Sequence, residues 1–358
     1  MAELTDNLRT TLSAIQRRAL IVGGVALALT AVGIALSSTS QVLQSYLFAF
    51  LFFFGLSAGS MFLLQLQHLT SGVWGLMIRR FTEASVLVIP WMAILFIPIA
   101  AGITILYEWT DPHVLAEEAV VAAKQPYLNI PFFLARTVFY FVAWYYLVNR
   151  LRKLSIAQEN APKSESVSFR DKLAVTSGPG LAAHIMIWTF AATDWGMSLE
   201  PAWASSMYPV AWMVGQVLTN FAIWIIVLWM LSRNNLLGYE VPVDRLHDLG
   251  KFTFAFTVLW TYLNFSQYLI LWSGNVPEFT PWFYYRTNHG WEYLSIALIF
   301  GHFFLPFFLL ISRHTKRNFN VVSRIAMWIV AIEIVYVFWI INPAFHHEGL
   351  QIHWTHFT

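Results

Sequence analysis

Long apolar stretches separated by short polar segments dominate the pattern of this chain. Nine of these stretches reach the roughly 20 residues that a helix needs to cross the hydrocarbon core of a bilayer. They lie at about residues 19–38, 43–70, 84–107, 131–149, 179–198, 206–231, 252–272, 289–312 and 321–341. No alternation of apolar and polar positions with a period of two competes with them. The pattern therefore predicts an all-α polytopic membrane protein with about nine spans.

The composition supports this class and narrows the chemistry. Residues of the AVILMFWYC set make up 58% of the 358 residues and charged residues only 11%, whereas soluble domains have about 25% charged residues. The chain contains no cysteine, which excludes disulfides, iron–sulfur clusters and covalently attached c-type haem. A formal net charge of +2 gives no electrostatic reason to expect binding of nucleic acid.

The basic residues are distributed unevenly between the connecting segments. If the N-terminus is cytoplasmic, eighteen of the 21 Lys and Arg residues fall on inside segments and two on outside segments, while Arg136 lies within a span. Cytoplasmic loops of membrane proteins carry such an excess. We therefore expect a cytoplasmic N-terminus and expect residue 358 on the outer face.

One polar connector offers the only credible division of the chain. Residues 154–178 are polar and are expected to form a partly flexible cytoplasmic connector. It separates an N-terminal membrane half at 1–153, with spans 1–4, from a C-terminal half at 179–358, with spans 5–9 and an outer-face tail. The other long loop, residues 108–130, is expected on the outside.

Several ionisable or strongly polar side chains fall within or beside the spans, where a charge at mid-bilayer costs at least a few kcal/mol. Arg136 and Asp194 are candidates for a buried structural pair. Asn264 and Gln267 share a helix face and are candidates for quinone contacts, or for hydrogen bonds between helices. Acids and imidazoles form the candidate proton path: His68, Glu83, His184, Asp194, Glu292, His302 and Glu333.

Each candidate has a structural alternative. His68 and Glu83 lie near the interface, where long side chains reach water at little cost, and His184 can bond a neighbouring helix. His302 and Glu333 lie deeper and are harder to explain by packing. The in-span histidines lie at different depths, which argues against a haem b pair. Carboxylates, imidazoles and amides together suit proton transfer or hydrogen bonding to a quinone headgroup.

Four unusual strings carry a family resemblance. They are QHLTSGVWGLMIRR at 67–80, FAATDWGMSLEPAWASSMYPVAWMVGQ at 190–216, SQYLILWSGNVPEFTPWFYYRTNHGW at 266–291 and NPAFHHEGLQIHW at 342–354. With them the chain resembles, over nearly its whole length, the ActF-type, NrfD-like membrane subunits of bacterial alternative complex III. That complex is a quinol:cytochrome c (or other acceptor) oxidoreductase.

The resemblance implies two four-helix bundles, spans 2–5 and 6–9, with a flanking helix, in a bacterial inner membrane. It implies as partners a sister NrfD-like subunit, an iron–sulfur subunit, c-type cytochrome subunits, small membrane subunits and lipids. Haem c and iron–sulfur clusters then belong to the partners, and this chain holds no cofactor. Quinol or menaquinol is the implied ligand, although the usual quinol-oxidising pocket lies in the sister subunit. The family's acidic pair in DWxMSLEP corresponds to Asp194 and Glu200.

The chain departs from the family pattern in two places. After SLEP the family has His-Trp, whereas this chain has Ala202 and Trp203, which removes one outer-face imidazole. Family members usually have ten spans, and we expect nine here.

The sequence thus favours a cofactor-free membrane subunit of a quinol:electron acceptor oxidoreductase in a respiratory or photosynthetic chain. Its expected contribution is proton conduction, support of the quinol site, or assembly. A purely structural membrane anchor is the first alternative. A proton-coupled secondary transporter is the second, but Pro90 and Pro98 in span 3 have no matching interruption in the other half.

Overall fold

The chain folds almost entirely into helices. The computed structural model describes residues 2–277 and 279–357, and no strand occurs among them. Within these residues, eight helical segments are long and apolar enough to cross a membrane. They are Arg9–Leu36, Thr39–Thr70, Arg79–Ala101, Ile130–Asn160, Val167–Leu199, Tyr208–Arg233, Trp291–Ile311 and Phe319–Ala344. The prediction of an all-α polytopic membrane protein is confirmed.

The remaining predicted span, residues 252–272, lies within another long helix, α13 (Val243–Gly274). This helix is less apolar than the other eight because polar side chains such as Asn264 and Gln267 interrupt its aliphatic and aromatic ones. It packs against α12 (Tyr208–Arg233) within the helical bundle.

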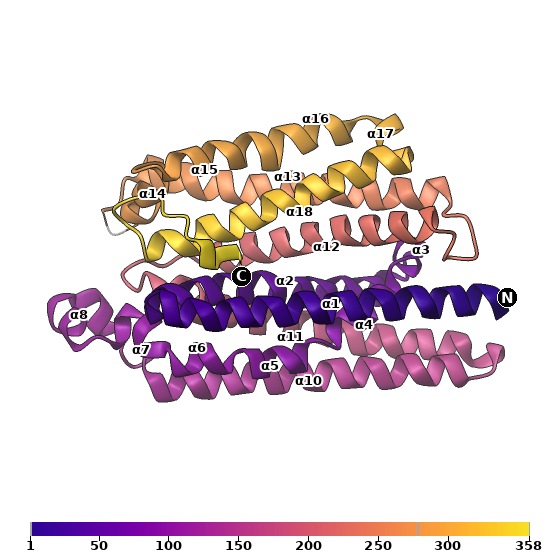
Figure 1. Ribbon diagram of the computed structural model, residues 1–358, viewed down its shortest axis with the longest axis horizontal. Coiled ribbons are helices and arrows are strands. Elements are labelled where there is room, and N and C mark those ends of the chain that lie inside the picture. Colours follow the sequence, from indigo (N-terminus) through magenta and orange to yellow (C-terminus); the bar gives the residue numbers. More distant parts are fainter. Residues whose placement is uncertain (1, 278, 358) are drawn as a thin grey trace.

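Apart from the N-terminal helix, the long helices form two bundles that lie side by side (Figure 1). The first contains α2 (Thr39–Thr70), the broken span α4 to α7 (Arg79–Leu106), α10 (Ile130–Asn160) and α11 (Ser166–Trp195). The second contains α12, α13, the span α15 to α16 (Trp291–Ile311) and α18 (Phe319–Ile341). Helix α1 (Ala2–Leu36) flanks α2. This arrangement agrees with the two bundles that the resemblance implies.

Two spans are interrupted, one in each bundle. Span 3 consists of α4 (Arg79–Val86), α5 (Ile89–Leu95), α6 (Ile97–Ala101) and α7 (Ile103–Leu106), and both α5 and α6 carry a proline in their first turn. Proline lacks the N–H that a continuous helix needs. In span 8, a π-helical segment, Ile299–Phe304, joins α15 (Trp291–Leu298) to α16 (Leu305–Ile311). The interruptions occupy different places in their bundles: the second helix of the first and the third of the second.

The expected connector at 154–178 is mostly helical instead of flexible. Helix α10 continues to Asn160 and α11 begins at Ser166, so only a short segment with a 3₁₀ turn, Lys163–Glu165, separates them. Ala, Gln, Glu, Lys and Arg, which are strong helix formers, supply nine of the 25 residues from 154 to 178. The polarity of the stretch therefore marks helices that extend beyond the membrane, and not a linker.

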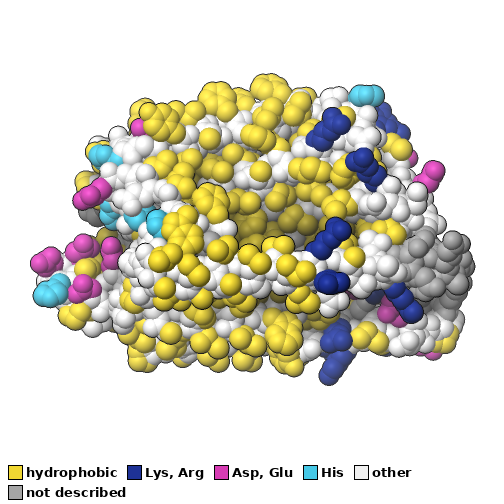
Figure 2. Space-filling model, viewed as in Figure 1, with side chains coloured by type: hydrophobic (Ala, Val, Ile, Leu, Met, Phe, Trp, Pro, Cys, Tyr) yellow, Lys and Arg dark blue, Asp and Glu magenta, His cyan; other side chains and the backbone are white. Residues whose placement is uncertain are grey.

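The two ends of the molecule differ in charge. The end that holds the start of α1, α3 (Val73–Leu76) and α17 (Arg313–Arg317) gathers the Lys and Arg side chains in Figure 2, and we call it the basic end. The opposite end gathers Asp, Glu and His side chains, and we call it the acidic end. Its short helices are η1 (Glu108–Thr110), α8 (Pro112–Glu117), α9 (Ala119–Ala123), η3 (Met197–Leu199), α14 (Thr280–Thr287), η5 (Asn342–Ala344) and η6 (Trp354–Phe357).

Helix α2 forms the centre of the structure because it is buried along most of its length and contacts both bundles. Its contact with α12 is the seam between the bundles, which we define by Gly55 and Gly59 on α2 and Gln216 and Asn220 on α12. A Cβ atom at Gly59 would lie 2.8 Å from the backbone oxygen of Gln216 and 2.3 Å from Nδ2 of Asn220. Glycine is therefore required for this close approach.

We expect the substitution Gly59→Ala to destabilise the protein by about 1–3 kcal/mol, because the added methyl group meets backbone across the seam. The matched control is Gly24→Ala on α1, where no heavy atom lies within 4 Å of the added Cβ. Thermal unfolding in detergent, followed by circular dichroism, compares the two variants. Equal unfolding temperatures for Gly59→Ala and the control would contradict this account of the seam.

Candidate functional site

A buried ionisable pair joins span 8 to span 9. The Nε2 atom of His302 lies 2.7 Å from Oε2 of Glu333, and both residues are 1% exposed. His302 comes from the π-helical segment, and such segments are frequent at functional sites. Its ring stacks on Trp260 with the ring centroids 3.7 Å apart. The imidazole is therefore held in one orientation.

Polar atoms around this pair lack hydrogen-bond partners within the described residues. They are Nδ1 of His302, Oε1 of Glu333 and both amide atoms of Gln216. Glu333, Gln216 and Thr219 line a small cavity between α2, α12 and α18. The volume of this cavity is about 10 Å³, which is close to the space that one water molecule requires. Buried orphan groups are rare in native structures and mark strain, function or a water position.

Glycine at two positions makes room for these side chains. A Cβ atom at Gly215 would lie 2.6 Å from Oε1 of Glu333, and one at Gly55 would lie 2.8 Å from Nε2 of Gln216. Gln216 and Glu333 therefore both line the cavity, and no described hydrogen bond joins the amide to the carboxylate. Sequence analysis missed Gln216, and its only signal is an amide in a span otherwise rich in apolar residues.

Polar contacts extend from this cavity in both directions. Toward the basic end, the Ser60 hydroxyl donates to Oδ1 of Asn220 at 2.6 Å, and Nδ2 of Asn220 donates to the Gln216 carbonyl at 2.8 Å. Toward the acidic end, the Tyr336 hydroxyl donates to Oδ1 of Asn264 at 3.3 Å. These groups follow the seam and then the inner face of the second bundle.

The two candidates for polar contacts, Asn264 and Gln267, line one narrow cavity near the acidic end, together with Tyr336 and Ser205. The Ser205 hydroxyl donates to Oε1 of Gln267 at 3.0 Å. Both amides thus face protein, where they connect α13 to α18 and to the segment before α12.

Arg136 and Asp194 form a bidentate ion pair in the first bundle. Nε and Nη2 of Arg136 lie 2.8 and 2.9 Å from the two carboxylate oxygens. The Tyr140 hydroxyl also donates to Asp194 at 2.7 Å, and Nη1 of Arg136 donates to the Tyr127 carbonyl. Asp194 is fully buried. Because both oxygens are engaged, the geometry favours a structural role for this carboxylate.

A second buried ion pair was not predicted from the sequence. Arg286 on α14 is fully buried, and its Nη2 lies 2.7 Å from Oε2 of Glu200. Its guanidinium lies 3.8 Å from the centroid of the Trp282 ring and donates to the carbonyl oxygens of Trp282 and Ile340. The only signal in the sequence is a single arginine within an aromatic string of an outer segment.

Three other candidates are bound locally. Nε1 of Trp144 donates to Nδ1 of His184 at 3.0 Å inside the first bundle. Glu292 accepts from the backbone N–H of Gly290 at 2.7 Å and so caps the start of α15 at the acidic end. Glu83 pairs with Arg79 and Arg80 at 2.8 and 2.7 Å at the basic end.

His68 lies beside Glu83 on the wall of a cavity of about 220 Å³ at the basic end. Its Nδ1 lies 3.1 Å from the Ser177 hydroxyl on α11. Among the described contacts, the seven proton-path candidates therefore do not form one hydrogen-bonded line. The structure brings together His302 with Glu333, and His68 with Glu83, and leaves the others at separate places.

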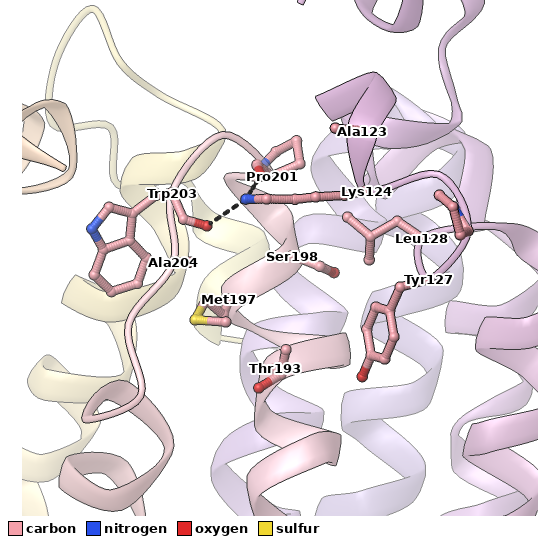
Figure 3. Close-up of a pocket in the computed structure, with 11 residues that line it drawn as sticks. Ala123, Lys124, Tyr127, Leu128, Thr193, Met197, Ser198, Pro201, Trp203 and Ala204 are labelled. Carbon is pink, nitrogen blue, oxygen red and sulfur yellow. Dashed lines mark hydrogen bonds between the residues drawn. The ribbon is translucent and has the colours of Figure 1, made fainter. Parts of the chain in front are cut away.

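The largest cavity described at the acidic end, about 240 Å³, lies between the α9–α10 loop and the turn that follows α11 (Figure 3). Lys124 crosses its rim and donates to the carbonyl oxygens of Pro201 at 2.6 Å and Trp203 at 3.3 Å. Partial burial lowers the pKa of Lys124. The lining of this cavity is mainly apolar. The hydrogen bonds of Lys124 join the outer loop to the turn across the rim.

Comparisons with known proteins add no assignment. No protein-family model matches the chain, and a search of curated proteins finds no match. Among the described residues, no group of three or more His, Asp or Glu side chains is arranged to hold a metal ion. The functional argument therefore rests on the geometry above and on the sequence strings.

We expect Asp194→Asn to destabilise the protein by about 3–5 kcal/mol, because it leaves the Arg136 guanidinium buried without a counter-charge. Asp111→Asn is the matched control. Asp111 is exposed and caps α8, where asparagine caps equally well.

Unfolding temperatures in detergent report the difference between the two variants. The double substitution Arg136→Met with Asp194→Leu should recover much of the loss, because apolar replacement of a whole buried pair is often tolerated. An Asp194→Asn protein as stable as the Asp111→Asn control would show that the pair does not support the fold.

Proposed function

We propose that this chain is a cofactor-free membrane subunit of a quinol:electron acceptor oxidoreductase, and that the His302–Glu333 pair moves protons through it. The observation that carries the proposal is the unmet hydrogen-bonding capacity of this buried pair, whose Glu333 lines a water-sized cavity together with Gln216. The resemblance to the NrfD-like subunits supplies the reaction class.

The pair suits proton movement on electrostatic grounds. A proton can pass between the imidazole and the carboxyl group over 2.7 Å, which interconverts an ion pair and a neutral pair without changing the net charge. A free-energy cost for charge in the low-dielectric interior then arises only when the pair exchanges a proton with neighbouring groups.

The route that fits the contacts differs from the one expected from the sequence. It begins at His68 at the basic end, although no described hydrogen bond joins His68 to Ser60. From Ser60 it follows hydrogen bonds along the seam to Asn220 and Gln216 and then reaches Glu333 and His302. It continues past Tyr336, Asn264 and Gln267 to the acidic end. Bound water in the cavity beside Gln216 would complete the link to Glu333. Asp194, His184 and Glu292 lie off this route.

We further propose that the basic end faces the cytoplasm and the acidic end the outside of a bacterial inner membrane. The excess of basic side chains at one end supports this orientation (Figure 2). Subunits that carry iron–sulfur clusters and haem c would dock at the acidic end, and quinol or menaquinol would reach the complex from the bilayer beside a sister NrfD-like subunit.

A structural anchor is the second candidate function. The ion pairs Arg136–Asp194 and Glu200–Arg286 favour it, because they fix both bundles at the acidic end and engage both oxygens of each carboxylate. The two functions are compatible, since they use different residues. They differ in the consequence of removing the acid of the buried pair.

In the assembled complex, Glu333→Gln should lower quinol-linked proton movement by about tenfold or more, because the amide cannot accept and release a proton. The control is Glu292→Gln, which alters a carboxylate at the helix cap. Proton uptake and release are measured in proteoliposomes with equal amounts of assembled complex. If Glu333→Gln moves protons as well as the control does, only the structural role remains.

The orientation has its own test, which the cysteine-free sequence makes simple. Single cysteines are introduced at the exposed residues Ser164, between α10 and α11, and Ala116, on α8. A membrane-impermeant thiol reagent added to intact cells should label Ala116→Cys, while Ser164→Cys should react only after lysis. Labelling of Ser164→Cys in intact cells would reverse the proposed orientation.

A further inference from the structure

The cavity at the basic end carries an inference that does not depend on the proposed function. It has a volume of about 220 Å³ and lies between α2, α4 and α10. We propose that it binds the headgroup of an anionic phospholipid from the membrane leaflet at this end. The ligand chemistry is a phosphodiester with acyl chains attached.

The position of the cavity fits a lipid headgroup. His68 lies near the end of the spanning segment Thr39–Thr70, and Arg80 near the start of the segment Arg79–Ala101. The cavity therefore lies where the apolar parts of two spans give way to polar chain. Basic pockets between spanning helices at the cytoplasmic interface bind anionic lipid headgroups.

The charges around the cavity complement a phosphate. Glu83 is bonded to Arg79 and Arg80, and Arg80 also pairs with Glu159. Arg152 lines the cavity, is exposed, and has no ion-pair partner among the described contacts. The cavity lining thus contains two guanidinium groups, Arg80 and Arg152, and one carboxylate, Glu83, which leaves an excess of positive charge on Arg152.

A buried donor without a partner points to the same ligand. His68 is 5% exposed, and its Nε2 atom has no hydrogen-bond partner in the described structure. When the Ser177 hydroxyl donates to Nδ1, Nε2 carries the ring hydrogen and can donate to a phosphate oxygen. Leaving such a group unpaired has a free-energy cost of about 1–3 kcal/mol.

The apolar part of the cavity distinguishes a lipid from a free phosphate ion. Its wall includes Val86, Leu87 and Ile156. Leu87, directly after α4, and Ile156, on α10, are also exposed. These side chains continue from the cavity toward the membrane. An acyl chain can lie against them, whereas a phosphate ion gains nothing from apolar walls.

Native mass spectrometry of the full-length protein, purified in detergent with added phosphatidylglycerol or phosphatidylcholine, tests the proposal. We expect selective binding of phosphatidylglycerol. Arg152→Gln should weaken it about fivefold, the effect of one interfacial basic side chain. Arg150→Gln is the matched control, because Arg150 is exposed on the same helix but does not line the cavity.

Two variants that each add a bulky side chain give a second test of the site. Ala84→Phe should fill the mouth of the cavity and reduce phosphatidylglycerol binding, whereas Val88→Phe adds the same ring one turn further along, outside the lining. Circular dichroism confirms that all variants are folded.

Three outcomes would overturn the proposal. They are equal binding of phosphatidylcholine, equal loss for Arg152→Gln and Arg150→Gln, and full displacement of the lipid by 10 mM inorganic phosphate. The first two would indicate general surface attraction. The third would indicate a site for the free ion.

Discussion

The close approach of α2 and α12 at the seam is the constraint on which the rest of the structure depends. Polar side chains cannot face the hydrocarbon of a bilayer, so Asn220, Gln216 and Glu333 must all face protein. Gly55 and Gly59 allow the two backbones to meet closely enough to enclose them. The same contact joins the two bundles, because α2 packs on α11 in one and on α12 and α18 in the other. Polar burial and bundle assembly therefore have one physical origin.

At the acidic end, a single turn also joins the two bundles, and it does so through ion pairs. Asp194 closes α11 and pairs with Arg136 in the first bundle, and Glu200, six residues later in the chain, pairs with Arg286 in the second. Directly after Glu200, the Pro201 carbonyl accepts a hydrogen bond from Lys124. A short segment with two acids thus connects α10, α11 and α14. This explains why the string TDWGMSLEP is both polar and deeply packed, a combination that a simple loop would not need.

The sequence located the spans approximately, proposed Arg136 and Asp194 as a pair, and singled out His302 and Glu333 individually, because a charge in an apolar run has few acceptable explanations. Sequence reasoning failed where the position of a residue along the chain does not indicate how deeply the residue is buried. Arg286 lies in an outer segment, yet α14 folds back and buries it completely. The π-helical turn that orients His302 leaves no pattern in hydrophobicity. The polar stretch after residue 153 resembled a linker, because helices that extend into water lose the apolar periodicity used to recognise them.

The buried polar groups of this protein divide into two kinds, and the division carries the functional argument. Asp194, Glu200 and His184 accept hydrogen bonds from partners fixed by packing, and such saturated networks stabilise one arrangement. Glu333, His302, Gln216 and His68 each keep an atom without a partner. An unpaired buried polar atom is unfavourable, so folding alone gives no reason to retain these four. Groups with spare capacity are the ones that can exchange protons or bind a ligand. The groups whose hydrogen bonds are all made stabilise the fold, and this fold keeps the groups with an unpaired atom in position.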